Sequence, residues 1–151
     1  MLYQLPPGWP VNLERLETFL KALPRRRRHA MEFRDPSWHS DAVFALLRRH
    51  KVALCLHDMA GSATERLAVG PFIYVRFHGP HRYSGRYGDA TLERWAEWLA
   101  ARAREGLPVY AYFNNDMGGH AQKDAARLRA AIAGLAGQAG RAGRARRAAK
   151  A

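Results

Sequence analysis

The chain has 151 residues, 48% of them hydrophobic, which is enough for one domain with a sizeable core and argues against a wholly disordered chain. No apolar run approaches the roughly 20 residues of a membrane span, so we expect no membrane partner, and the N-terminus lacks the pattern of a signal peptide. Cys55 is the only cysteine, which excludes an intramolecular disulfide and a cysteine-based zinc site and favours a cytoplasmic location.

The net charge of +12 favours a polyanionic partner at first sight, but it is unevenly placed. The run Arg25–Arg28 contributes +4, the segment after Gly134 contributes +5, and +3 remains for everything else. That last segment is almost entirely Ala, Gly and Arg. We therefore predict a domain over residues 1–135 and a disordered basic tail over residues 136–151. The tail either binds nucleic acid weakly and without sequence choice or is a solvated extension.

Short strand patterns alternate with amphipathic helical patterns along the chain. In chain order they are a strand at 2–5, a helix from Asn12 to Pro24, a strand at 29–34, a helix from Ser40 or Asp41, strands at 52–56 and 72–77, a helix from Asp89 to Gly106, a strand at 109–113 and a helix from Gly119 to Leu135. This alternation predicts an α/β fold with parallel strands, and both a doubly wound sheet and a (β/α) barrel fit it. No GxGxxG or Walker-type loop follows a strand, so the main signature of a nucleotide-binding fold is missing.

Polar side chains gather toward the C-terminal end of each predicted strand. Alternation places Glu32 and Arg34 on one face of their strand, Arg76 and His78 on one face of theirs, and Asp58 in phase with leucines. A sheet covered by helices on both faces is nearly all apolar, so this pattern favours the mouth of a barrel, where barrel enzymes build their sites. The alternative is that Glu32–Arg34 and Arg76–Asp58 are structural ion pairs.

The residue types at this mouth suggest anion binding and acid–base chemistry. The candidate catalytic residues are Glu32, His78 and Asp58. The candidate substrate-binding residues are Gln4, Arg34, Arg76, Tyr112, Asn114 and Asn115. Arginines bind phosphate or carboxylate bidentately, histidine transfers protons near neutral pH, and asparagine orients substrate. Glu32 is a general acid or base if burial raises its pKa, and a partner of Arg34 if it does not.

The glycine-rich, basic and aromatic segment 79–88 is either a loop that closes over a ligand or a mobile surface loop. Metal binding is a weaker prediction. Five residues are candidates to converge on an ion: Glu32, His57, Asp58, His78 and His120. No HxxxH or HxH spacing singles them out, so we predict neither a metal nor a cofactor.

Four motifs in order carry a family resemblance. They are Gln4-Leu5-Pro6-Pro7, Glu32-Phe33-Arg34-Asp35-Pro36-Ser37-Trp38, Tyr74-Val75-Arg76-Phe77-His78-Gly79 and Tyr112-Phe113-Asn114-Asn115. Together they resemble the motifs of the DUF72 (YecE-like, UPF0759) family. The resemblance implies a TIM-barrel-like fold of unassigned activity. It also maps that family's polar strand ends onto Gln4, Glu32, Arg34, Asp58, Arg76, His78 and Asn114.

The chain departs from this family at its start. Family members begin with a strand ending in SGW, a second carrying ExNxTFY and a third carrying a lysine, and none of these is present. The resemblance therefore implies a partial TIM-like barrel, strands four to eight, with about five parallel strands and flanking helices and without the family's first three strands. After the last motif, Asp124-Ala125 stands where the family usually carries Asn-Ala.

Three explanations of the short barrel stay open: a start assigned too late, a truncated or split gene, and a chain that associates with itself through open barrel edges. Three functions stay open too. The chain is an enzyme-like barrel that binds a small anionic, phosphorylated or carbohydrate-like molecule. Alternatively it is a nucleic-acid-associated protein that uses Arg25–Arg28 and the tail, or it is an inactive remnant.

Overall fold

The computed structural model describes residues 1–148, and the side-chain environments of residues 1–137. Its elements are β1 (Leu2–Gln4), α1 (Leu13–Ala22), β2 (Ala30–Glu32), the 3-10 helix η1 (Pro36–Trp38), α2 (Asp41–Arg49), β3 (Ala53–Asp58), β4 (Ile73–Phe77), α3 (Asp89–Arg104), β5 (Val109–Phe113), the 3-10 helix η2 (Met117–Gly119) and α4 (His120–Ala148). The predicted strands and long helices are all confirmed, and the two 3-10 turns are additions.

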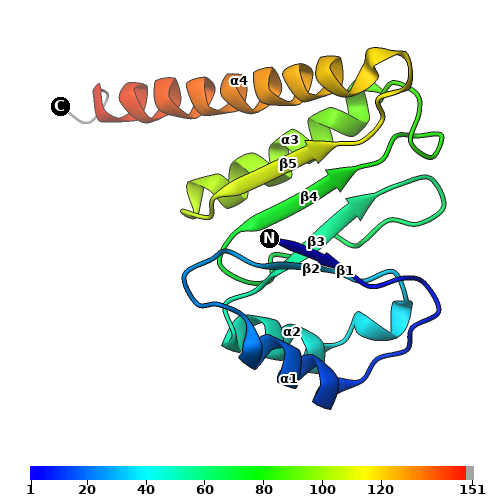
Figure 1. Cartoon of the computed structure of the whole chain (residues 1–151). Coiled ribbons are helices and arrows are strands. Elements are labelled where there is room, and N and C mark those ends of the chain that lie inside the picture. The colour runs from blue at the N-terminus through cyan, green and yellow to red at the C-terminus, as the bar shows by residue number, and fades with distance from the viewer. Residues whose placement is uncertain (149–151) are drawn as a thin grey trace.

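The five strands form one parallel sheet in the order β1-β2-β3-β4-β5 (Figure 1). Each strand therefore lies beside the next strand in the chain, and the C-terminal ends of all five lie at the same edge. Sequential parallel order is the arrangement of successive strands in a (β/α) barrel, and it confirms the α/β prediction. The structure is compatible with part of such a barrel.

One face of the sheet is covered by the helices. Strand side chains such as Leu56, Val75 and Phe77 share a single buried cluster with Leu47 of α2 and Leu99 of α3. Phe77 is fully buried; its ring stacks on Phe113 with centroids 4.5 Å apart and meets the edge of Trp95 at 5.1 Å. The alternation of apolar side chains along the strands produces this packing, because every second residue points to the helices.

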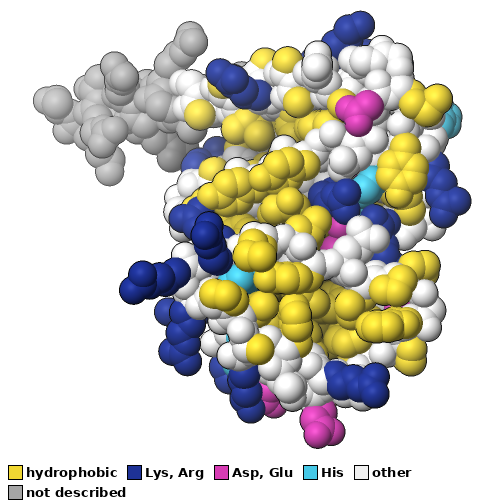
Figure 2. Space-filling view, in the orientation of Figure 1, with side chains coloured by type: hydrophobic (Ala, Val, Ile, Leu, Met, Phe, Trp, Pro, Cys, Tyr) yellow, Lys and Arg dark blue, Asp and Glu magenta, His cyan; other side chains and the backbone are white. Residues whose placement is uncertain are grey.

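The opposite face consists of residues in the strands or next to their ends. A second, smaller cluster contains Ala30, Ala53, Cys55 and Phe72, with Leu2, Tyr74 and Tyr110 packed against it. Figure 2 shows hydrophobic side chains across this face, with basic side chains and an acidic one near the C-terminal ends of the strands. This open face carries the polar residues that the sequence predicts for a barrel mouth.

Helix α4 runs to Ala148, so the predicted helix end at Leu135 is too early. Residues 136–148, which we expected to be disordered, continue that helix. Alanine and arginine, which make up most of this segment, are strong helix formers. The division of the chain at residue 135 remains a prediction, and residues 149–151 of the tail lie outside the described residues. No helix among the described residues is long and apolar enough to cross a membrane.

Gly70 fits a position where no side chain can be placed. Its φ is +92°, and a Cβ there would lie 2.3 Å from the carbonyl oxygen of Val52 and 2.7 Å from the Cα of Ala53. We expect Gly70→Ala to lower the free energy of unfolding by more than the roughly 1–3 kcal/mol of a strained backbone alone. Urea unfolding followed by tryptophan fluorescence measures the loss.

Gly106→Ala is the matched control, because Gly106 has a φ of +87° and a Cβ added there would meet nothing within 4 Å. Substitution there adds the backbone strain without the collision. If both variants lose the same free energy of unfolding, the close approach of the backbone to Gly70 does not contribute to the loss.

Candidate functional site

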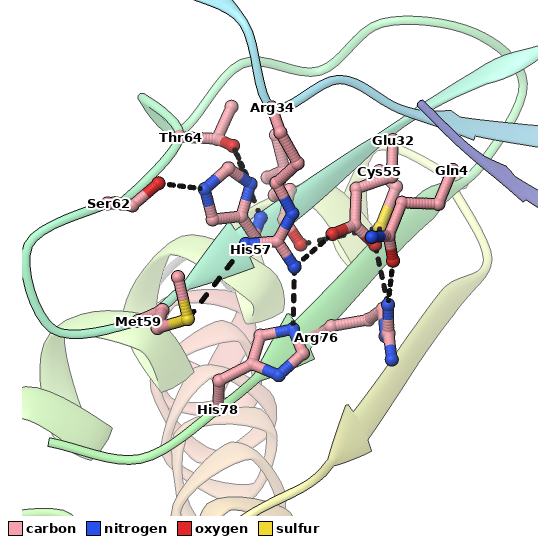
Figure 3. A network of polar contacts seen from close by, with 11 residues as sticks. Gln4, Glu32, Arg34, Cys55, His57, Met59, Ser62, Thr64, Arg76 and His78 are labelled. Carbon is pink, nitrogen blue, oxygen red and sulfur yellow. Dashed lines mark hydrogen bonds and ion pairs between the residues drawn. The ribbon is translucent and has the colours of Figure 1, made fainter. Parts of the chain in front are cut away.

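A fully buried carboxylate lies at the centre of the open face. Glu32, the last residue of β2, has an exposed fraction of 0%. Its carboxylate forms an ion pair with the Arg34 guanidinium, and it accepts a hydrogen bond of 2.7 Å from Nη1 of Arg76 (Figure 3). A buried charge requires such partners because the protein interior solvates it poorly. Two arginines share one carboxylate, so this group of three side chains has a net charge of +1.

Two neutral side chains extend this group. Arg76 also donates from Nη1 to Oε1 of Gln4 at 3.1 Å, and Nη2 of Arg34 lies 3.3 Å from Nε2 of His78. The arginine–glutamate cluster, as we name it, consists of Gln4, Glu32, Arg34, Arg76 and His78. Strand register brings them together, because Gln4 lies opposite Glu32 on neighbouring strands. The predicted grouping of these residues is therefore present in the structure, while their roles stay predictions.

The charges of the arginines determine the state of Glu32. Burial acts to raise the pKa of its carboxyl, but the hydrogen bond from Arg76 and the charges of Arg34 and Arg76 outweigh it. The pKa lies below its ordinary value, and the carboxylate is ionised at neutral pH. Of the two roles considered from the sequence, the structure therefore favours the ion-pair partner over a general acid.

His78 in the cluster and His57 beside it are neutral at pH 7. Burial, with Arg76 and Arg34 beside it, lowers the pKa of His78 to about 4. Burial and the charge of Arg34 lower the pKa of His57 to about 4 as well. No described residue pairs with Nδ1 of His78, and the ring of Tyr83 meets it edge-on with centroids 5.2 Å apart. Nδ1 of His78 is therefore a buried nitrogen without a hydrogen-bond partner in the described part of the chain.

His57 and Cys55 are residues of this region that the prediction of the mouth missed. They alternate with the core leucines of β3 and face the open side, and His57 lies opposite Arg76 in the register of β3 and β4. Sγ of Cys55 lies 3.6 Å from Oε2 of Glu32, and burial raises the pKa of the thiol. The signal was available in the alternation of β3, which assigns Cys55 and His57, rather than Asp58, to the polar face.

Asp58 does not belong to the cluster. The sequence predicts it as a catalytic residue at the mouth, but its side chain points to the helix-covered side of the sheet. Its carboxylate accepts hydrogen bonds from Nε1 of Trp95 at 2.7 Å and from the hydroxyl of Tyr87 at 3.1 Å, on the helix-covered side. The expected Arg76–Asp58 ion pair is wrong for the same reason: the two side chains leave adjacent strands on opposite faces. Arg76 pairs with Glu32 instead.

Asn115 is also directed away from the cluster. It is fully buried, and its Nδ2 donates to the carbonyl oxygen of Gly85 at 2.8 Å and to Oδ2 of Asp124 at 2.9 Å. Asp124 further accepts from the backbone N–H of Tyr87 at 3.0 Å and from Arg127 at 2.6 Å. This network fastens the loop 79–88 to α4. Asn115 thus positions a loop beside the mouth rather than lining it.

Tyr112 and Asn114 lie at the β5 end of the sheet. Tyr112 is opposite Arg76 in the register of β4 and β5, is 46% exposed, and stacks on Tyr74 with centroids 4.9 Å apart. Oδ1 of Asn114 is buried and has no hydrogen-bond partner within the described part of the chain. The exposed Tyr112 ring therefore borders the cluster on its open side.

The remaining predictions concern metal and nucleic acid. Among the described residues, no three His, Cys, Asp or Glu side chains lie close enough to hold a metal ion, so the five candidate ligands do not converge there.

Arg28 contacts the hydroxyl of Tyr110, and its guanidinium lies over Phe72 at 6.0 Å. These contacts are at the N-terminal ends of β4 and β5, opposite the cluster. Nucleic-acid binding by Arg25–Arg28 stays a prediction for a separate surface.

Comparisons with known proteins agree with the motif resemblance. The family model described as "Protein of unknown function DUF72" matches residues 1–147, which extends well beyond the segments that carry the motifs. None of the curated proteins matches the chain. A DUF72 family protein from Thermotoga maritima has a similar structure, with a TM-score of 0.74, 23% identity, and coverage of 89% of this chain and 56% of that one.

A DUF72 family protein from Enterococcus faecalis is similar too, with a TM-score of 0.69, 19% identity, and coverage of 87% of this chain and 57% of that one. At these identities the likeness establishes the fold alone. The chain spans little more than half the length of the solved structures that it matches.

The two ion pairs of Glu32 predict a large effect of its neutralisation. We expect Glu32→Gln to cost about 3–5 kcal/mol of unfolding free energy at pH 7, because it leaves two arginines without their anionic partner. The folded-state pKa is lowered, so the stabilisation is present above the unfolded value of about 4.3 and is lost as the pH falls through the folded-state pKa. Urea unfolding of both proteins between neutral and acidic pH measures this.

Glu17→Gln removes the same charge from a partly exposed surface residue that pairs with Lys21 and Arg49, and we expect a much smaller loss. A difference between wild type and Glu32→Gln that stays constant down to strongly acidic pH would contradict the assigned ionisation of Glu32.

Proposed function

The chain belongs to the DUF72 family, a family of unknown function, and we propose that it binds a small anionic molecule at the arginine–glutamate cluster. In this proposal the cluster is the mouth of a (β/α) barrel, and the five strands correspond to the fourth to eighth strands of the complete fold. The order of the four motifs and the sequential parallel sheet support this correspondence.

The charge balance of the cluster carries the proposal. One carboxylate compensates two guanidinium groups, and the two nearby histidines are neutral because their pKa values are lowered to about 4. One positive charge therefore remains in a largely buried setting, where electrostatic attraction is stronger than in water. The Arg76 side chain is 20% exposed and opens to the uncovered face, so an anion has access to it.

The shape of the donors indicates the ligand class. A guanidinium presents parallel N–H groups that match a phosphate or carboxylate. Gln4, already bonded to Arg76, adds an amide, and the exposed ring of Tyr112 offers an apolar surface on which a sugar or a flat ring packs. A phosphorylated or carbohydrate-like small molecule with an anionic group fits this combination best.

The residues would have different roles toward such a ligand. Arg76 would bind the anion, and Glu32 would hold Arg76 and Arg34 in place through its two ion pairs. His78, neutral and with a free Nδ1, is the acid–base candidate. Asp58, which the sequence suggested for catalysis, has no part in this proposal because it faces the helices.

Substitution of Arg76 tests the proposal. We expect Arg76→Ala to weaken binding of inorganic phosphate by about tenfold or more, since a hydrogen bond to a charged group contributes about 1.5–3 kcal/mol. Titration of the 151-residue chain with phosphate, followed by NMR chemical shifts of the histidine ring protons, measures the affinity.

Arg49→Ala is the matched control, because Arg49 is also paired with a glutamate, Glu17, but on the exposed surface of α2. We expect its phosphate affinity to equal that of the wild type. Circular dichroism verifies that both variants are folded. Equal affinities in wild type and Arg76→Ala, or no phosphate binding by the wild type, would overturn the proposal.

A further inference from the structure

A hollow of about 470 Å³ lies next to the arginine–glutamate cluster. The segment after β3 forms one of its walls, and the segment from Phe33 through η1 to α2 forms another. Its polar lining includes Arg34, His39, His57, Ser62 and Thr64. Arg34 belongs both to this lining and to the cluster, so the hollow and the cluster adjoin at this residue.

A chain of hydroxyl and imidazole groups borders the hollow. Oγ of Ser62 lies 2.9 Å from Nε2 of His57, and Oγ1 of Thr64 lies 2.8 Å from Nδ1 of the same ring. The backbone holds this arrangement, because the N–H of Thr64 donates to the carbonyl oxygen of His57 at 2.9 Å and the N–H of Ser62 donates to that of Met59 at 3.0 Å. His57 is 3% exposed and engaged at both nitrogens, so its ring orientation is fixed.

Arg34 brings an unpaired donor to the same place. Its side chain is 8% exposed, and its Nε has no partner in the described part of the chain. Burying an unpaired donor is unfavourable, which makes it a position where a ligand oxygen is stabilised. The charge of Arg34 also helps to keep His57 neutral, so the ring has a lone pair for a proton at neutral pH.

From these contacts we infer that Ser62 is a nucleophile and His57 its general base, in the hydrolysis of a carboxylic ester of a small anionic molecule. Thr64 is a positioning residue that orients the ring, and Arg34 places positive charge beside the oxyanion that develops. The inference rests on the proposed function, because the arginine–glutamate cluster holds the anionic group of the ester while the hollow receives its carbonyl group.

The reaction uses only the ester and water. Oγ of Ser62 bonds to the carbonyl carbon and its proton passes to Nε2 of His57. The bond between that carbon and the alcohol oxygen then breaks, and His57 returns the proton to the leaving alcohol. Water next attacks the acyl-serine, His57 takes its proton, and Ser62 leaves with that proton as the carboxylic acid is released.

A fluorophosphonate probe tests Ser62 directly on the full chain. Its phosphorus bonds to a serine oxygen, fluoride leaves, and the serine proton passes to the base, so labelling reports an activated serine. We expect mass spectrometry to find the label on Ser62, the Ser62→Ala variant to remain unlabelled, and His57→Gln to be labelled about 100-fold more slowly. Thr64→Val, a milder change, is expected to slow labelling to an intermediate rate.

Ser84→Ala is the control, since Ser84 also lies in a loop but its hydroxyl bonds, among the described residues, only to the carbonyl oxygen of His81. We expect it to be labelled as fast as the wild type. Absence of the label from Ser62 in the wild type overturns the inference. Labelling of folded His57→Gln and Thr64→Val at the wild-type rate overturns it as well.

Phosphate titration separates this result from the proposed function. Labelling that depends on His57 in a chain that binds no phosphate would leave the nucleophile in place and overturn anion binding at the cluster. Phosphate binding that depends on Arg76, in a chain whose Ser62 is unreactive, would support anion binding at the cluster and overturn the assignment of Ser62 as a nucleophile.

Discussion

The carboxylate of Glu32 is the group on which the open face of the sheet depends. It is fully buried and ionised, and two arginines from different strands and loops compensate it. Through Arg76 it is linked to Gln4 on β1, and through Arg34 to His78 after β4. Because a buried charge without partners is costly, the two arginines have to stay in contact with Glu32, and Gln4 and His78 contact these arginines in turn.

The sheet separates two polar networks with different tasks. On the helix-covered side, Asp58 is bonded to Trp95, and Asp124 joins Asn115 to Arg127, so these buried acids fasten α3, α4 and the loop 79–88 to the strands. On the open side, the polar groups keep unused donors and acceptors: Nε of Arg34 and Nδ1 of His78 have no partner among the described residues. Each network thus leaves buried atoms without a partner in this part of the chain, Oδ1 of Asn115 on the helix-covered side and the two nitrogens just named on the open side.

Alternation along the strands was sufficient to group Gln4, Glu32, Arg34, Arg76 and His78, because side chains two residues apart share a face and parallel strands end at one edge. It failed where residue type was given more weight than phase. Asp58 carries a carboxylate but is in phase with the core leucines of β3, whereas His57, a candidate metal ligand alone, is in phase with Cys55 on the open face.

The sequence by itself determined the strand and helix order, the parallel α/β class and the family, since periodicity and ordered motifs are local properties of the chain. Only the tertiary structure decided that Arg76 pairs with Glu32 rather than Asp58, that Asn115 binds Asp124, and that His57 meets Ser62 beside Arg34. Those pairings depend on strand register and on which face is covered by helices, and both are set by long-range packing that no single segment encodes.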